Sequence, residues 1–228
     1  MVALFVILTI VAFIAVDSLV QWNEARQRQR QLRPVEGVPR WLTFGLESVS
    51  VPAGVFLGPG HTWMRLDLAG TAHVGVDQFV QRAIGRIDAI ELPRPGQTVQ
   101  EGEPLVTLRQ GDRLAPVRSP VDGTVVAVNE NLARHPEVLA TDPYVEGWIA
   151  VIKPRHLASA LRRLLIAEEA RAWLKQELER FKEFIASRPL ETVAVGQALQ
   201  DGGHPTAGVL ELMDEQTWVL FTEEFLST

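Results

Sequence analysis

The chain has 228 residues, of which 46% are hydrophobic and 22% are charged, so it can bury a core as one extended domain or two small ones. Its formal net charge of −6 argues against nucleic acid as the main partner, because proteins that bind nucleic acid usually carry a basic excess. The absence of cysteine excludes disulfides, thiolate metal sites and cysteine nucleophiles.

An almost wholly apolar run opens the chain, from Val2 to Val20. About 20 such residues span a bilayer as a helix. A cleaved signal peptide is the alternative, but the basic residues follow the apolar run instead of preceding it. They are Arg26, Arg28, Arg30 and Arg33. By the positive-inside rule we expect a single-pass anchor in the inner (cytoplasmic) membrane, with the main domain on the cytoplasmic side.

Asp17 is the one charged residue inside this apolar run. Two explanations stay open. Asp17 reaches headgroup water near Trp22, a residue type suited to the membrane interface, or it contacts the transmembrane helix of a partner. Asp17 and Trp22 are therefore candidate partner contacts.

The chain after the anchor first predicts a connector and then a β domain. Residues 34–59 are expected to form an ordered connector, because they are too apolar for a disordered tether. His61–Arg65 and Thr71–Val76 alternate apolar and polar residues, which predicts a β-hairpin. Asp77–Ile84 is expected to be a short amphipathic helix that Asp77 caps and Gly85 ends.

The stretch from Gly102 to Gly123 organises the rest of this domain. Leu105–Leu108 is an apolar, β-favouring run, and Leu114–Val121 is a second extended run whose prolines block helix. A Gly-Asp pair, Gly111-Asp112, lies between them and signals a tight turn. The pattern predicts a projecting hairpin on a small β domain.

The hairpin and its flanks resemble the glycine cleavage system H protein family. The matching motifs are Gly60-His61-Thr62-Trp63, Glu91-Leu92-Pro93, Pro120-Val121-Asp122-Gly123, Asp142-Pro143-Tyr144 and Glu146-Gly147-Trp148. The resemblance covers residues 60–154 and implies a biotinyl/lipoyl-like barrel-sandwich domain, mainly β with helical additions. Periodicity alone predicts only a small β domain with short helices.

In that family the hairpin tip holds a lysine to which lipoate is attached, preceded three residues earlier by a glutamate. In an ungapped alignment Asp112 falls at the lysine position and Arg109 at the glutamate position. A carboxylate cannot form the amide that carries lipoate, because that reaction needs a primary amine. The lysines of the chain are Lys153, Lys175 and Lys182, none of them at a hairpin tip. We therefore expect a non-lipoylated domain without a cofactor.

Candidate catalytic and metal sites are sparse in the sequence. His61 and His73 lie on neighbouring predicted strands, but two imidazoles without an obvious third ligand fall short of a zinc site. We expect structural or surface roles for them and no bound metal. No Ser/His/Asp order is apparent, and the turn at Asp201–Pro205 is not followed by the Gly-Lys-Ser/Thr of a phosphate loop. We expect that the protein is not an enzyme.

The C-terminal part of the chain is expected to be helical. Apolar residues recur at helical spacing from His156 to Ser187 and predict one helix, with a kink as an option. Two alternatives stay open: its apolar stripe folds back on the β domain, or it meets a partner, in which case Trp173 and Phe181 are candidate contacts. Glu215–Leu226 predicts a final amphipathic helix.

The predicted organisation is an anchor with a basic stalk, a connector, an H-protein-like domain and a helical extension, over residues 1–33, 34–59, 60–154 and 155–228. It suggests a non-enzymatic, membrane-anchored accessory or scaffold subunit that docks in a larger membrane complex, with a respiratory or photosynthetic complex as the expected host. The alternative is an unmodified lipoyl-carrier mimic that binds glycine-cleavage or lipoate-handling enzymes. Both functions make proteins, and not nucleic acid, the partners.

Overall fold

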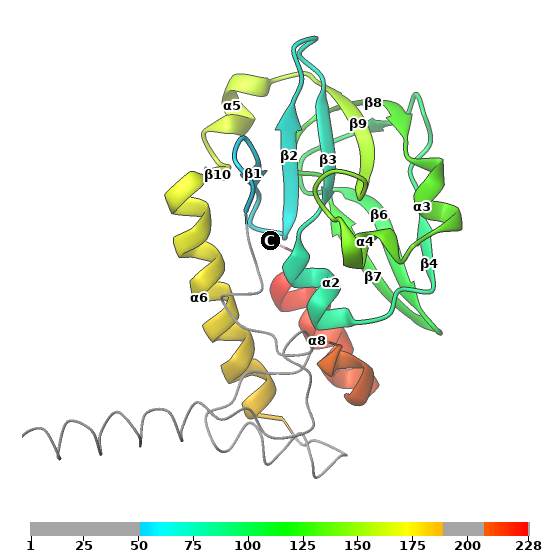
Figure 1. The fold of residues 1–228 in the computed structure, drawn as a ribbon, viewed down its shortest axis with the longest axis vertical. Coiled ribbons are helices and arrows are strands. Elements are labelled where there is room, and N and C mark those ends of the chain that lie inside the picture. Colours follow the sequence, from blue (N-terminus) through cyan, green and yellow to red (C-terminus); the bar gives the residue numbers. More distant parts are fainter. Residues whose placement is uncertain (1–50, 189–207, 228) are drawn as a thin grey trace, which may run out of the picture. The chain divides into compact units, whose positions relative to one another are not determined.

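The computed structural model describes residues 51–188 and 208–227, which belong to one compact unit (Figure 1). The predicted anchor, its basic stalk and most of the connector lie outside the described residues, as do Asp17 and Trp22. Among the helices that the structure describes, none is both long and apolar enough to cross a membrane.

A seven-stranded antiparallel sheet forms the larger part of the β structure, in the order β10-β1-β2-β3-β9-β8-β5. Its strands are β1 (Phe56–Leu57), β2 (Thr62–Leu66), β3 (Ala72–Val76), β5 (Thr98–Val99), β8 (Gly123–Val128), β9 (Trp148–Pro154) and β10 (Leu165–Ile166). The alternating pattern correctly predicts the β2–β3 hairpin, in which Met64 pairs with Val74. Both of these side chains point into the core.

A second, three-stranded sheet carries the central hairpin. It consists of β4 (Ala89–Glu91), β6 (Pro104–Gln110) and β7 (Arg113–Arg118), in the order β4-β6-β7. One face of the hairpin is buried through Val106, Leu108, Ala115 and Val117. Pro116 lies on β7, an edge strand of this sheet, where a missing N–H is tolerated.

Three short helices lie in the chain between β3 and β9. α2 (Gln78–Ile84) begins as predicted at Asp77, whose Oδ1 accepts a hydrogen bond from Val80 N at 3.2 Å, and it ends at Gly85, whose φ is 85°. Its apolar face is fully buried. α3 (Glu130–Arg134) and α4 (Val138–Thr141) follow β8. The mainly β architecture with helical additions is confirmed.

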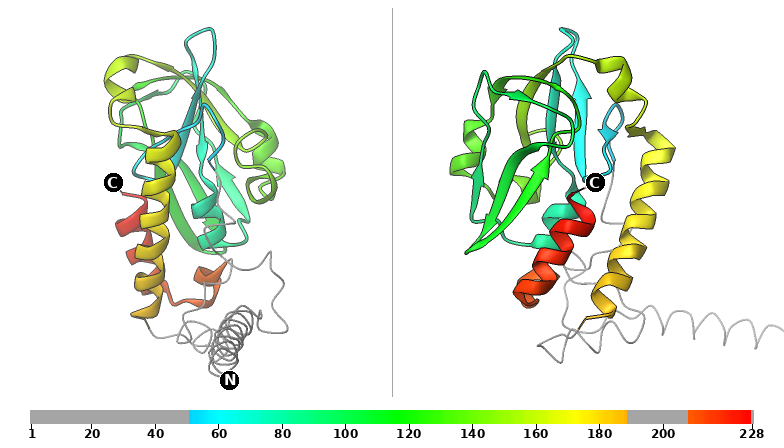
Figure 2. Two further views of the ribbon diagram at one scale, coloured as in Figure 1. Left: turned by 60° about the vertical axis from the view of Figure 1, so that its left-hand side comes forward. Right: turned by 180° about the vertical axis from the view of Figure 1, so that it is seen from behind.

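The predicted helix over residues 156–187 is not continuous. α5 (Leu157–Leu161) is followed by β10, which pairs with β1, and only then does α6 (Ala167–Ala186) begin. The reason is tertiary: the backbone of β10 is hydrogen-bonded to a strand about one hundred residues earlier, which a local helical pattern does not reveal. α6 then runs along one side of the molecule (Figures 1 and 2).

The end of the chain packs between α6 and α2. It contains a 3₁₀ helix, η3 (Val209–Leu212), and α8 (Glu215–Phe225), which Asp214 caps by accepting from Thr217 N at 2.8 Å, as predicted for a final helix. The aromatic rings of Phe79, Phe181, Phe221 and Phe225 lie with centroids 5.3 to 6.4 Å apart. The apolar stripe of α6 is thus covered by its own chain (Figure 2).

Candidate functional site

The tip of the β6–β7 hairpin is the first candidate site, because the sequence comparison with a carrier family points to it. Gly111 and Asp112 form the turn, with Gly111 at φ 57° and both residues exposed. Arg109 projects from the outer face of β6 and makes an ion pair with Glu91 on the adjacent β4. The structure therefore places Asp112 at the apex of the hairpin. Arg109 lies below the apex, on the outer face of β6.

The hairpin tip is fastened to the end of α2 and the loop that follows it. Gln110 Nε2 donates hydrogen bonds to the carbonyls of Ile84 at 2.9 Å and Arg86 at 2.7 Å. The amide of Gly111 donates to Asp88 Oδ2 at 2.8 Å. These contacts fix the direction in which the turn points.

Arg113 fastens the same tip to the C-terminal segment. Its Nη1 donates to the carbonyl of Leu210 at 2.9 Å, and its Nη2 to that of Met213 at 2.7 Å. Its Nε lies 3.1 Å from Glu215 Oε2. The guanidinium also stands over the ring of Trp218, 5.5 Å from its centroid. Sequence reasoning missed Arg113, because its partners lie about one hundred residues further along the chain.

An open hollow of about 500 Å³ lies beside the tip. Six charged residues line it: Arg86, Asp88, Asp112, Arg113, Glu211 and Glu215. Both arginines already have carboxylate partners, Arg86 with Asp88 at 2.8 Å and Arg113 with Glu215. The hollow is thus a polar, net-negative surface feature and not an enclosed apolar site of the kind that holds a small-molecule cofactor.

A lipoyl group, which the carrier resemblance implies, does not fit the residues present. Its amide needs a lysine amine at the apex, and the apex side chain is the carboxylate of Asp112. Lys153 lies on β9, whereas Lys175 and Lys182 lie on α6. No lysine of the chain is therefore on the hairpin.

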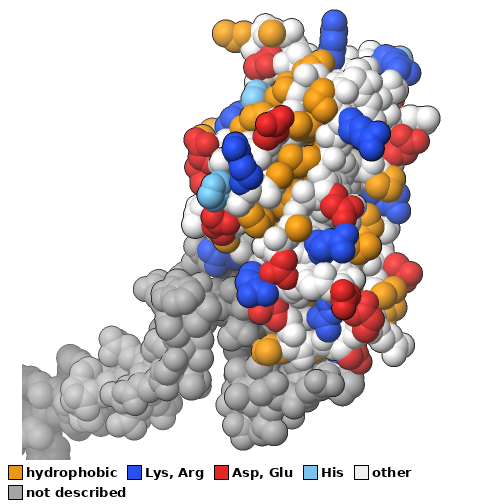
Figure 3. Space-filling model, turned by 90° about the vertical axis from the view of Figure 1, so that its right-hand side faces the viewer, with side chains coloured by type: hydrophobic (Ala, Val, Ile, Leu, Met, Phe, Trp, Pro, Cys, Tyr) orange, Lys and Arg blue, Asp and Glu red, His pale blue; other side chains and the backbone are white. Residues whose placement is uncertain are grey.

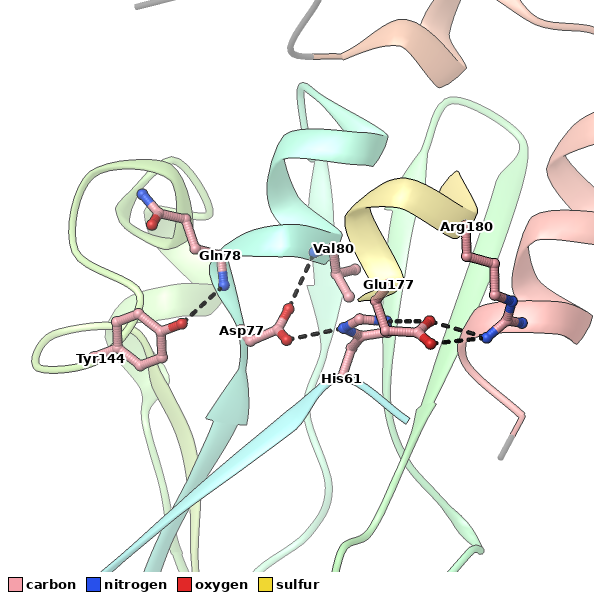
Figure 4. Close-up of polar contacts among 7 residues, drawn as sticks. All are labelled: His61, Asp77, Gln78, Val80, Tyr144, Glu177 and Arg180. Carbon is pink, nitrogen blue, oxygen red and sulfur yellow. Dashed lines mark hydrogen bonds and ion pairs between the residues drawn. The ribbon is translucent and has the colours of Figure 1, made fainter. Parts of the chain in front are cut away.

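A buried polar cluster around His61 is the second candidate site (Figure 4). His61 Nδ1 donates to Asp77 Oδ2 at 2.9 Å, and His61 Nε2 lies 3.6 Å from Glu177 Oε2. Arg180 donates to both oxygens of Glu177, at 2.9 and 3.1 Å. The imidazole is fully buried and stacks on Phe79 with 4.1 Å between ring centroids. The cluster therefore joins the start of α2 to α6.

The charged groups in this cluster stabilise the ionised forms of one another. Burial by itself lowers the pKa of His61, but the Asp77 and Glu177 carboxylates outweigh it and raise the pKa above the ordinary value. Burial raises the pKa of Glu177, yet the facing imidazole of His61 and the charge of Arg180 bring it below its ordinary value. Nearby, burial raises the pKa of Tyr144, whose hydroxyl accepts from Gln78 N at 3.4 Å. The arrangement favours a charged imidazolium between two carboxylates.

His73 is not part of this cluster. It lies on β3 opposite Arg65, whereas His61 precedes β2 and donates no bond toward it. The ring of His73 packs edge-on against Trp148 at 5.4 Å, and burial, followed by the charge of Arg65, lowers its pKa. Among the residues that the structure describes, no group of three or more histidine, aspartate or glutamate side chains is arranged to hold a metal ion.

The candidate partner contacts on α6 have different surroundings. Phe181 is fully buried against Phe79 and the rings of α8, so it offers no surface to a partner in this conformation. Of the two alternatives for the apolar stripe of α6, the described conformation shows packing within the chain, with α8 against Phe181. Trp173 is half-buried, with its ring 4.9 Å from that of His61.

Comparison with known proteins bears directly on the hairpin and the domain that carries it. The family model described as "Glycine cleavage H-protein" matches residues 58–177. "Glycine cleavage system H protein 2" of Aquifex aeolicus is 39% identical over 118 residues, which is 52% of this chain and 73% of that protein. The glycine cleavage system H protein of a Psychrobacter species is 40% identical over 125 residues, 55% of this chain and 98% of that one.

A solved structure is similar as well. The crystal structure of a glycine cleavage system H protein from Mycobacterium marinum covers 54% of this chain and 98% of its own, with 26% identity and a TM-score of 0.49. The matches leave the first 57 residues and those beyond 177 outside the family model.

Proposed function

The chain belongs to the glycine cleavage H-protein family, and on that premise we propose that it is a non-enzymatic, membrane-anchored accessory subunit that uses a non-lipoylated H-protein-like domain for docking. The observation that carries this proposal is the exposed carboxylate of Asp112 at the hairpin apex. A carrier needs an amine at that point, and the lysines of this chain lie on β9 and α6. Without an amine at the apex, the domain retains its surface for binding a partner.

The surface of the domain supports a protein partner over nucleic acid. Acidic, basic and hydrophobic side chains are interspersed over the face seen in Figure 3, without a large region of one charge. Nucleic acid needs a basic patch, and the described residues of this face form none. The net charge of −6 agrees with this choice.

The membrane part of the proposal depends on the sequence outside the described residues. The apolar run of residues 2–20 is long enough to span a bilayer, and by the positive-inside rule the arginines that follow it favour a domain on the cytoplasmic side. A subunit held in this way meets membrane complexes at high local concentration, because an anchor restricts it to the membrane plane. A respiratory or photosynthetic complex is the expected host.

The second candidate function keeps the biology of the family. An unmodified domain that matches H proteins over residues 58–177 is also suited to binding glycine-cleavage or lipoate-handling enzymes as a carrier mimic. The observation that favours it is that relatives are covered over 73% to 98% of their own length, so most of the carrier domain is retained. This candidate predicts soluble enzymes, and not membrane subunits, as partners.

Purification of the native protein in mild detergent tests both candidates. We expect stoichiometric co-purification with integral membrane subunits, and recovery of soluble glycine-cleavage enzymes would instead favour the mimic. A lone monomer in several mild detergents would defeat both.

Intact mass tests the missing modification separately. The chain should have its unmodified mass apart from N-terminal processing, whereas a lipoylated H protein from the same host, handled in parallel, should show the added lipoyl group. A lipoyl-sized increase on this chain would refute the non-lipoylated domain.

A further inference from the structure

The free edge of the hairpin is covered by the end of the chain. β7 pairs with β6 on one side only, and an unpaired strand edge exposes backbone hydrogen-bonding groups. Trp218 Nε1 on α8 donates to the carbonyl of Leu114 on this edge at 3.0 Å. β4 pairs with β6 on the other side of the hairpin. Both strands that lead to the apex therefore have a neighbour.

Residues 208–226 are also seated on α2, so the contact is more than a single hydrogen bond. The amide of Gly208 donates to the carbonyl of Arg82 at 2.6 Å, and Glu211 accepts from the amide of Arg86. The fit is close: a Cβ atom added at Gly85 would lie 2.6 Å from the Cα of Gly208. The segment thus binds α2 and the hairpin at the same time.

Arg113 is the centre of this contact. Its side chain is 22% exposed, and its three donor nitrogens all face residues 210–215. Hydrogen bonds from a charged donor are stronger than neutral ones and demand good geometry. Around them, Val209, Leu210 and Trp218 are at most 1% exposed. The charged hydrogen bonds and the buried side chains together make this contact specific for residues 208–226.

We propose that residues 208–226 bind the hairpin as an intramolecular ligand. The bound segment prevents a modifying enzyme from enclosing the apex of the hairpin. A modifying enzyme has to surround the turn in order to bring its reacting atoms to the apex side chain. Here α8 flanks β7 and β4 flanks β6, so only the turn itself stands free. The proposal concerns the hairpin alone and does not depend on the anchor or on the identity of the docking partner.

The test restores an amine at the apex and then releases the segment. Asp112→Lys supplies the nucleophile in the full chain, kept in mild detergent. A lipoate–protein ligase presents lipoyl-adenylate; the amine attacks its carbonyl carbon, an amide forms, and AMP and a proton leave. We expect Asp112→Lys/Arg113→Ala to be lipoylated at least about tenfold faster than Asp112→Lys, because the charged bonds that hold the segment are gone.

A matched control uses another arginine of the same strand. Arg118 lies at the far end of β7 and donates to the carbonyl of Gly102, away from residues 208–226. Asp112→Lys/Arg118→Ala should therefore be lipoylated at the same rate as Asp112→Lys. The proposal would be overturned if Asp112→Lys/Arg113→Ala and Asp112→Lys were lipoylated at the same rate. This includes the case in which neither variant is lipoylated.

Hydrogen exchange makes the result independent of the ligase. Arg113→Ala should speed exchange in residues 104–118 and 208–226 while β8 and β9 stay protected, which shows that the fold persists. Should that variant lose protection everywhere, Trp218→Phe is the milder change, since it removes only the indole donor to Leu114 and keeps a buried ring. Unchanged exchange at the hairpin in Trp218→Phe would then contradict the proposed contact.

Discussion

Replacing Glu177 by glutamine removes one negative charge from the contact between α6 and His61 while the shape of the side chain is kept. Glu177 Oε2 lies 3.6 Å from His61 Nε2, and Arg180 donates to both carboxylate oxygens. Glutamine retains one acceptor for Arg180. The perturbation is therefore mainly electrostatic and acts on a fully buried imidazole.

The expected loss of stability follows from the interactions that His61 and Arg180 retain in the variant. Hydrogen bonds to charged groups contribute roughly 1.5–3 kcal/mol. The Arg180 side chain is 43% exposed, so solvent screening reduces the contribution of its ion pair with Glu177 to about 1 kcal/mol or less. His61 keeps Asp77 at 2.9 Å and can also release its proton, which limits the penalty. We expect Glu177→Gln to lower the free energy of unfolding by about 1–3 kcal/mol at pH 6.

The loss should depend on pH in a defined direction. The pKa of His61 is raised on folding, so its stabilising contribution is complete below about pH 6.5 and is lost as the pH rises through the folded-state value. The pKa of Glu177 is lowered, so its contribution is present above about pH 4.3 and is lost as the pH falls. The difference between wild type and Glu177→Gln should be largest between these limits and should shrink at alkaline pH.

Urea unfolding of the full chain in mild detergent, at pH 6 and at pH 9, measures this difference. His61→Asn is the control, because asparagine tolerates the left-handed backbone of position 61, where φ is 58°, and cannot titrate. In that background Glu177→Gln should show no pH dependence from this pair. A loss as large at pH 9 as at pH 6 in the otherwise wild-type chain would refute the reasoning.

Three further changes have defined outcomes. Phe181→Ala should lower the free energy of unfolding by about 3–5 kcal/mol, because this ring is fully buried among other aromatic rings, and a melting temperature within a degree of wild type would contradict that packing. Gly75→Ala should cost about 1–3 kcal/mol in urea unfolding, since its Cβ would lie 2.6 Å from the Trp63 ring. Asp17→Leu should leave membrane insertion intact and, if Asp17 contacts a partner, loosen the complex on native gels, whereas unchanged migration would assign Asp17 to headgroup water.

Local signals in the sequence predicted the elements that depend on neighbouring residues. The β2–β3 hairpin follows from alternation, α2 from the cap at Asp77, and the central hairpin from its Gly-Asp turn. α8 follows from Asp214 and the apolar spacing after it. In each case the hydrogen bonds that define the element join residues only a few positions apart, or directly across a turn.

Elements that depend on distant contacts were not predictable in this way. The break between α5 and α6 exists because Leu165 pairs with Leu57. The roles of Arg113 and of Glu177 rest on partners about one hundred residues away. The sequence did not reveal the polar partners of His61, which are Asp77 at the start of α2 and Glu177 on α6, and not the second histidine, His73. Residue type suggested chemistry there, but only the fold assigns the partners.

The packing of α8 also bears on both candidate functions. Trp218, Phe221 and Phe225 are at most 1% exposed, and burying a large apolar side chain contributes about 1.5–3 kcal/mol. Displacing α8 would therefore cost about 4.5–9 kcal/mol from these three side chains alone. A micromolar complex is stabilised by about 8 kcal/mol. An enzyme that had to remove α8 to enclose the hairpin would lose most or all of such an affinity, whereas a partner that docks on the assembled surface loses none. The energetics therefore disfavour any partner, in either candidate function, that must displace α8 to enclose the hairpin.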